Sequence, residues 1–276
     1  MSRINQFFKD HPERKALISF LTAGDPTLEH TVAALHALVE GGVDILEVGV
    51  PFSDPEAEGP AIQASSERAL RNGTTLARVL QMIAEFRQTN THTPIVLMGY
   101  LNSILAMADF PARARDAGVD GLIMVNLPPE SAAELQQQLQ ACQIDLIYLV
   151  APTTTDERAR FILHNAAGFV YYVSLKGITG ADNLDTDTVS ARINELRQFT
   201  RLPLCVGFGI KTPDTAEAVA EFADGVVVGS ALVNLLTDYA DDVAAGCAAL
   251  TRAALALREG VDRGTQQALD HRTTGG

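Results

Sequence analysis

Short apolar runs alternate along the chain with longer stretches in which apolar residues recur at helical spacing. Eight of these runs have the length and composition of buried strands, and a helical pattern follows each one. Strands that are apolar on both faces and separated by helices are typical of a parallel sheet covered by helices. The predicted strands span residues 16–22, 43–50, 94–99, 121–125, 145–150, 168–174, 204–207 and 225–228.

Eight consecutive strand–helix units in a chain of 276 residues predict a single closed (β/α)8 barrel, or TIM barrel, for which about 250 residues is typical. An open, doubly wound sheet is the main alternative, but no G-x-G-x-x-G follows the first strand. We expect one domain over residues 1–276, with an N-terminal helix or arm in 1–13 and extra helices after strands two and eight. One helix is predicted over 103–117, the last helices over 231–258, and a frayed tail over 259–276.

Composition narrows the function. The formal net charge of -13 argues against binding a polyanion through bulk charge, so any phosphate must be bound locally. Three widely spaced cysteines suit reduced thiols, and no stretch resembles a signal peptide or a membrane span. A cytoplasmic location is therefore expected. The six histidines show no metal-ligand spacing, so we expect no metal site.

Carboxylates stand out in the segment from Leu46 to Gln63. Glu47 lies inside a predicted buried strand, and Asp54 and Glu58 follow in the loop after it. A buried carboxylate is costly to desolvate, so Glu47 is expected either to pair with a helix arginine or lysine or to do chemistry. Asp54 and Glu58 also fit ordinary turn and cap positions, and both interpretations remain open at this stage.

Glycines follow the last three predicted strands. The segments are 177–180, 207–209 and 229–230, and the last leads directly into a helix. Such glycines either form tight turns or let backbone N–H groups and a helix N-terminus bind a phosphate. In barrels of this kind a phosphate site commonly lies after strands seven and eight, which favours the second interpretation.

A lysine and the strand ends offer competing chemistries. Lys176 follows the sixth strand, where a Schiff-base lysine of an aldolase could lie, but it enters a glycine-rich loop and is more consistent with a solvated side chain. An isomerase with aspartates at the ends of strands one and five is disfavoured, since neither strand end supplies an acid.

Several motifs, in the same order along the chain, resemble the tryptophan synthase α subunit family. The resemblance covers nearly the whole chain and stops before the C-terminal tail. The main motif is L-E-V-G-V-P-F-S-D-P over 46–55, continued by A-E-G-P over 57–60; the others lie at 20–26, 98–102, 127–130, 177–180, 207–210 and 229–231.

The resemblance implies retro-aldol cleavage of indole-3-glycerol phosphate to indole and glyceraldehyde 3-phosphate. Glu47 matches the general acid/base. Glu58 matches the second acid, which interacts with the indole nitrogen and is most often aspartate in the family. Asn126 is another departure, because the family commonly has aspartate there.

The resemblance also implies the remaining roles. No cofactor is expected in this chain, whereas a β partner holding pyridoxal phosphate is expected to receive the indole in an α2β2 complex. A stand-alone lyase and a non-catalytic, phosphate-binding regulatory subunit are the rival functions. By resemblance, Phe20 and Tyr171 line the indole pocket, Thr179 lies on a lid, Pro51 and Asp54 face the partner, and the substrate phosphate is bound by Gly180, Gly209 and Ser230, with Gly207 and Gly229 in the same glycine segments.

Overall fold

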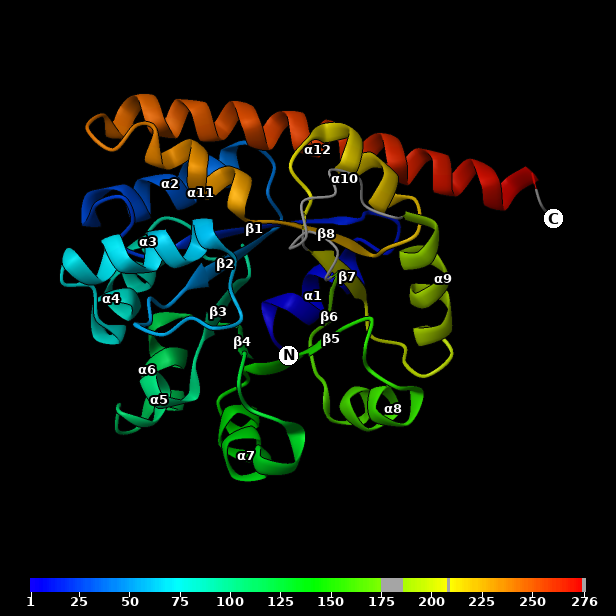
Figure 1. Ribbon diagram of the computed structural model, residues 1–276, viewed down its shortest axis with the longest axis horizontal. Coiled ribbons are helices and arrows are strands. Elements are labelled where there is room, and N and C mark those ends of the chain that lie inside the picture. The colour runs from blue at the N-terminus through cyan, green and yellow to red at the C-terminus, as the bar shows by residue number, and fades with distance from the viewer. Residues whose placement is uncertain (175–185, 208, 275–276) are drawn as a thin grey trace.

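The computed structural model describes residues 1–174, 186–207 and 209–274. Eight parallel strands close into a barrel in chain order, which confirms the predicted fold (Figure 1). Four strands have the predicted bounds, and the other four are shorter than predicted at one or both ends. The strands are β1 Ala16–Thr22, β2 Ile45–Gly49, β3 Ile95–Gly99, β4 Gly121–Met124, β5 Asp145–Val150, β6 Val170–Val173, β7 Leu204–Gly207 and β8 Gly225–Val228.

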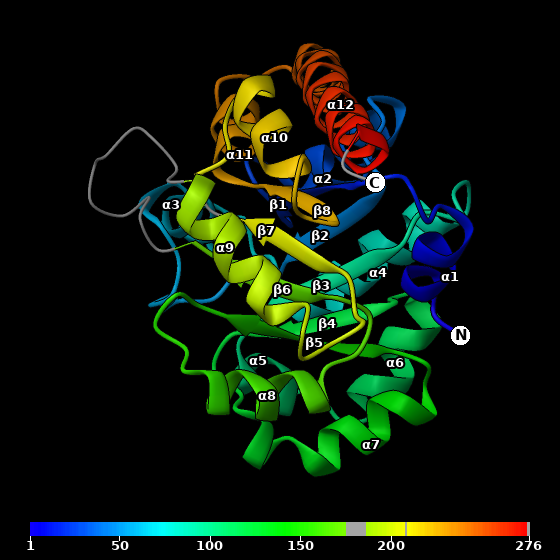
Figure 2. The ribbon, with the colours of Figure 1, turned by 90° about the vertical axis from the view of Figure 1, so that its right-hand side faces the viewer.

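Helices surround the barrel (Figure 2). One helix precedes β1, and two follow each of β2 and β8, as the sequence predicts. Among the described residues, no helix combines the length and the apolarity that crossing a membrane requires. The α-helices are α1 Arg3–Asp10, α2 Leu28–Glu40, α3 Pro60–Arg71, α4 Leu76–Arg87, α5 Leu101–Leu105, α6 Phe110–Ala117, α7 Ala133–Ala141, α8 Asp156–Asn165, α9 Thr186–Leu196, α10 Pro213–Ala220, α11 Ser230–Thr237 and α12 Val243–Thr274; η1 Pro129–Ser131 is a 3-10 turn.

Two helix predictions were wrong. The helix predicted over 103–117 is divided into α5 and α6, because Asp109 adopts a left-handed backbone (φ 55°) and a proline lies in the first turn of α6. The frayed tail predicted over 259–276 is instead the continuation of α12 to Thr274. Its glycines pack closely on another helix: a Cβ added at Gly260 or Gly264 would meet the backbone of α10.

Apolar side chains of α1 and of the strands fill the amino end of the barrel interior. Ile4 of α1 is fully buried and packs with inward side chains of the strands, among them Ile45, Val96 and Ile147. Figure 2 places α1 at one end of the barrel. Because strand side chains alternate between faces, Glu47 points inward one step beyond Ile45, toward the opposite end. Apolar packing thus closes one end, and polar groups lie toward the other.

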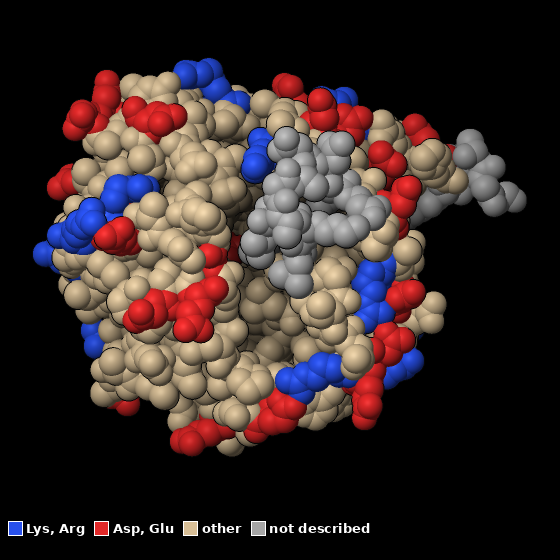
Figure 3. Space-filling view, viewed as in Figure 1, with Lys and Arg blue, Asp and Glu red and all other residues tan. Residues whose placement is uncertain are grey.

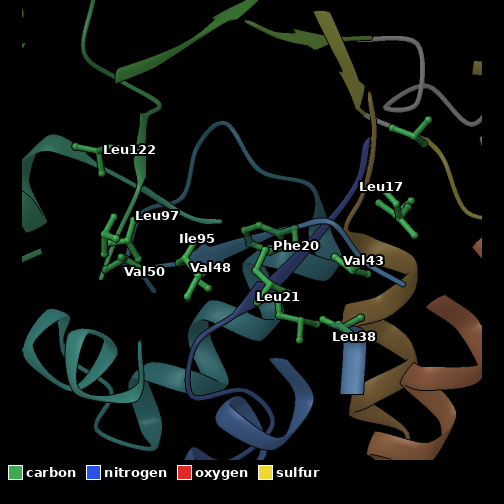
Figure 4. Close-up of a cluster of buried hydrophobic side chains, with 14 of the residues drawn as sticks. Leu17, Phe20, Leu21, Leu38, Val43, Val48, Val50, Ile95, Leu97 and Leu122 are labelled. Carbon is green, nitrogen blue, oxygen red and sulfur yellow. The ribbon is translucent and has the colours of Figure 1, made fainter. Parts of the chain in front are cut away.

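The outward faces of the strands pack against the helices. Leu21 of β1, Val48 of β2 and Leu38 of α2 are all less than 5% exposed and belong to one apolar cluster (Figure 4). The sequence showed near-continuous apolar strands for this reason, since both faces of each strand are buried.

At the amino end of the barrel, aspartates that precede strands accept backbone N–H groups of neighbouring strands. Asp120 precedes β4, and its carboxylate accepts the backbone N–H of Ile95 at 2.9 Å and pairs with Arg87 at 2.9 Å. Asp44 and Asp224 likewise accept N–H groups at the starts of neighbouring strands. These carboxylates therefore accept hydrogen bonds from backbone N–H groups at the strand starts that have no acceptor on a neighbouring strand.

Candidate active site

Glu47 lies inside the barrel with only 1% of its surface exposed. Among the described residues it has no salt-bridge partner, and its Oε2 has no hydrogen-bond partner. Burial raises the pKa of Glu47 to about 8, and the negative charge of Glu58 adds to the shift. A structural ion pair was the alternative explanation for this residue, and no such pair is present in the described residues. The side chain can therefore carry a proton at neutral pH.

Two aromatic rings border Glu47. Phe20 of β1 is its register partner, and Tyr171 of β6 is close enough for the charge of Glu47 to raise the tyrosine pKa, with burial as the larger cause. Glycines leave room for both rings: a Cβ on Gly49 would lie 2.6 Å from Phe20, and one on Gly207 would lie 2.5 Å from the Tyr171 hydroxyl. The two rings and the acid thus share one small space in the barrel.

Glu58 lies in the loop between β2 and α3 and is half-buried. Burial raises the pKa of Glu58 to about 7, while a hydrogen bond with Tyr100 lowers it. The Tyr100 hydroxyl also accepts the backbone N–H of Ala57 at 3.2 Å, and its ring stacks on Phe52 at 4.7 Å. Tyr100 therefore holds the loop at three points.

Tyr100 was not among the predicted site residues. It follows β3 directly, at the carboxyl end of a barrel strand, and that position is the signal that could have identified it. Its partners, Ala57 and Glu58, are more than forty positions away in the sequence, so only the closed barrel brings them together.

The predicted phosphate residues lie at the ends of β7 and β8. Gly229 is the N-cap of α11, which begins at Ser230, and no side chain caps this helix in the described part of the chain. The first N–H groups of a helix without a side-chain cap suit an anion. Gly209 is exposed with a left-handed backbone (φ 81°), and nothing lies within 4 Å of where its Cβ would be.

Three residues singled out in the sequence, Lys176, Thr179 and Gly180, lie outside the described residues. The face of the molecule seen in Figure 3 is hollowed near its centre, with acidic side chains beside the hollow.

The three remaining positions of interest, Asn126, Asp54 and Pro51, lie in loops that follow strands. The amide oxygen of Asn126 accepts the backbone N–H of Leu101 at 2.8 Å, so a neutral hydrogen bond fixes the start of α5. Asp54 is exposed and accepts the hydroxyl of Ser53 at 2.8 Å, as a turn residue does, and Pro51 is buried at the end of β2.

Fold and site together define a class of protein: a (β/α)8-barrel enzyme with two carboxyl groups of raised pKa at the substrate end of the barrel. The sequence model of the family "Tryptophan synthase alpha chain" matches residues 8–261, and the chain belongs to that family. Members of the family are carbon–carbon lyases that cleave indole-3-glycerol phosphate, and this chain is an enzyme of that kind. Membership also implies a complex with a β subunit.

Known members of the family are similar to this chain in sequence and structure over most of its length. The tryptophan synthase alpha chain of Burkholderia thailandensis is 51% identical over 266 residues, which cover 95% of this chain and 97% of that protein. The one from Chromobacterium violaceum is 55% identical over 235 residues, or 84% and 90% of the two chains. A crystal structure of tryptophan synthase subunit alpha from Legionella pneumophila superposes with a TM-score of 0.88 at 42% identity, covering 95% of this chain and 99% of that one.

Proposed function

We propose that Glu47 is the general acid/base of the cleavage reaction and that Glu58 binds the indole nitrogen. The observation that carries the proposal is the buried position of Glu47, which keeps its carboxyl group protonated near neutral pH beside two aromatic rings. We further propose that the indole passes to a β subunit holding pyridoxal phosphate, in an α2β2 complex. Pro51 and Asp54 belong to the loop that faces this partner.

The reaction moves one proton through one carboxyl group. Protonated Glu47 donates its proton to C3 of the indole ring, and positive charge develops at the ring nitrogen. The resulting carboxylate then removes the proton of the hydroxyl on the adjacent side-chain carbon. The electrons of that O–H bond form the aldehyde, and the electrons of the broken carbon–carbon bond return to the ring. Glu47 ends in its starting, protonated form.

Glu58 stabilises the positive charge at the ring nitrogen by accepting its N–H, which requires the ionised carboxylate. The family more often has aspartate here, and Glu58 is longer by one methylene. Its hydrogen bond with Tyr100 supports the idea that this phenol holds the longer side chain in the orientation that the reaction needs.

The substrate phosphate is proposed to bind at the N-terminus of α11, at Gly229 and Ser230, with Gly209 of the preceding unit. The helix dipole and unbonded N–H groups attract the anion without a lysine, which suits a protein with a net charge of -13. Gly207 is proposed to give substrate and Tyr171 room. Thr179 and Gly180 would complete the site as lid and phosphate residues.

The proposed function is tested by measuring indole release from indole-3-glycerol phosphate with and without a β subunit. We expect slow cleavage by the chain alone and much faster cleavage on adding the β subunit. No response to the β subunit would favour the stand-alone lyase. Absence of cleavage in both conditions would sink the catalytic assignment.

A bell-shaped pH dependence of kcat/KM is expected, with its maximum between about 7 and 8. Glu58 acts ionised, so activity rises as the pH rises through about 7. Glu47 starts protonated, so activity falls as the pH rises through about 8. Because the charges of Glu47 and Glu58 interact, the two apparent pKa values read from the profile belong to the pair and not to either residue alone.

Tyr100→Phe should move the lower limb to higher pH, since it removes the hydrogen bond that lowers the pKa of Glu58 but keeps the ring on Phe52. Tyr148→Phe is the matched control, because the buried Tyr148 hydroxyl has no hydrogen-bond partner in the described residues. An unmoved lower limb in Tyr100→Phe would contradict this role of the phenol.

A further inference from the structure

Arg68 of α3 joins three segments that are distant in the sequence. Its Nε and Nη2 donate to the two carboxylate oxygens of Asp25, in the loop after β1, at 2.6 and 3.0 Å. Its Nη2 also donates to the hydroxyl of Thr237, the last residue of α11, at 2.9 Å. A two-pronged ion pair of this kind fixes the guanidinium in one orientation.

The aspartate side of the ion pair is buried, whereas the Arg68 side chain is 31% exposed. Asp25 is 4% exposed, and although burial raises its pKa, the charge and hydrogen bonds of Arg68 act in the opposite direction. α3 is also tied to the β1 end by a buried hydrogen bond between Ser65 and Thr22 at 2.6 Å, and by Asn72, which donates to backbone carbonyls of the same loop. The side of Arg68 that faces Asp25 is therefore held firmly.

The two helices that Arg68 joins each begin at one half of the proposed site. α3 begins at Pro60, directly after the loop that carries Glu58. α11 begins at Ser230, the proposed phosphate end, and its other end is Thr237. The Thr237 hydroxyl donates in turn to the carbonyl of Val233 within α11, so the guanidinium is linked to the helix backbone. A cation at a helix C-terminus also interacts favourably with the helix dipole.

We propose that Arg68 is a positioning residue that sets the place of α11, and so of the phosphate-binding N–H groups, relative to the loop with Glu58. The proposal rests on the proposed phosphate site. A short helix behaves as a rigid body, so a change at Thr237 displaces its first turn. Displacement by a fraction of an ångström weakens binding of the phosphate, whose partners are fixed backbone groups, while the apolar indole pocket stays intact.

Thr237→Val separates this role from general stabilisation. Valine keeps the shape of threonine but cannot accept from Arg68, and it leaves the ion pair with Asp25 untouched. Arg68→Lys is the second variant, since lysine keeps the charge but not the forked geometry. Thr251→Val is the matched control: Thr251 of α12 donates to the carbonyl of Ala37 at 3.0 Å, between two helices away from the site.

The measurement compares two inhibitors of indole-3-glycerol phosphate cleavage, using the complex with the β subunit. Glycerol 3-phosphate reports the phosphate site, and indole reports the apolar pocket. We expect Thr237→Val and Arg68→Lys to raise the inhibition constant of glycerol 3-phosphate, and KM, about tenfold. The constant for indole, and kcat, should change less than about twofold. Thr251→Val should change neither constant.

Two outcomes would overturn the inference. If both inhibition constants rise together, Arg68 supports the whole site without positioning the phosphate end. If only the thermal midpoint falls, its role is structural alone. Failure of the proposed phosphate site gives a different result. In that case glycerol 3-phosphate would not inhibit even the unmodified protein, and the inference about Arg68 would also be wrong.

Discussion

Replacing Glu47 by glutamine is expected to lower kcat for indole-3-glycerol phosphate cleavage by about 10²–10⁴-fold, the usual contribution of a general acid or base. Glutamine has nearly the same shape but carries no proton that can be transferred at neutral pH. Because the ring-binding and phosphate-binding groups are unchanged, the substrate should still bind. Single-turnover indole release and a substrate titration of the variant measure the two quantities separately.

Glu56→Gln is the matched control for this experiment. Glu56 is an acid of the neighbouring loop, but it is exposed. Its replacement should leave cleavage by the isolated chain within about twofold, since exposed loop acids seldom affect buried chemistry. Full activity in Glu47→Gln would disprove the mechanism, and equal loss in both variants would point to the charge of the loop in place of a single proton carrier.

The Glu47→Gln variant should be about as stable as the parent, because glutamine leaves polar atoms in the same buried place. One carboxyl oxygen of Glu47 is buried without a hydrogen-bond partner in the described residues, an arrangement that costs about 1–3 kcal/mol. Folding alone therefore gives no reason for an acid at this position, which is typical of a residue retained for chemistry.

Removal of the Asp120 side chain is expected to destabilise the protein by about 3–5 kcal/mol, the usual cost of leaving one partner of a buried ion pair alone. In Asp120→Ala, Arg87 loses its carboxylate partner, and its side chain is only 9% exposed. The N–H of Ile95 at the start of β3 and Arg3 of α1 lose their acceptor as well. Urea unfolding followed by circular dichroism measures the change.

Asp116→Ala is the control for Asp120→Ala. Asp116 pairs with Arg115 on the same helix, but its side chain is 67% exposed. An exposed ion pair contributes about 0–1 kcal/mol, so the unfolding midpoint should scarcely move. Equal midpoints for the two variants would mean that the aspartates at the base of the barrel do not hold the strands together.

Periodicity predicted the strands well because each is buried on both faces and so is apolar throughout. Helix ends were harder. Asp109 and the proline after Phe110 break a stretch that has continuous helical spacing, and the break depends on one left-handed backbone. The polar tail after Arg258 gave no sign of the close packing of Gly264 on α10.

Some of the site residues could likewise be predicted from the sequence, and others could not. Its acids and glycines could be found in the sequence, because charge inside an apolar strand and glycines at strand ends are local signals. Arg68 could not, since nothing local distinguishes it from any other arginine on a helix, and Tyr100 has only its position at the end of a strand as a local signal. Their importance comes from their partners Glu58, Asp25 and Thr237.

The sequence by itself determined the barrel, the family and the acid that we propose as the reactive one, because these depend on residue type and order along the chain. Only the tertiary structure decided how acidic the two carboxyl groups are and what orients them. The pKa of Glu47 depends on how completely the closed barrel excludes water from it. The orientation of Glu58 and of α11 depends on Tyr100 and Arg68, which reach them only after the strands have closed.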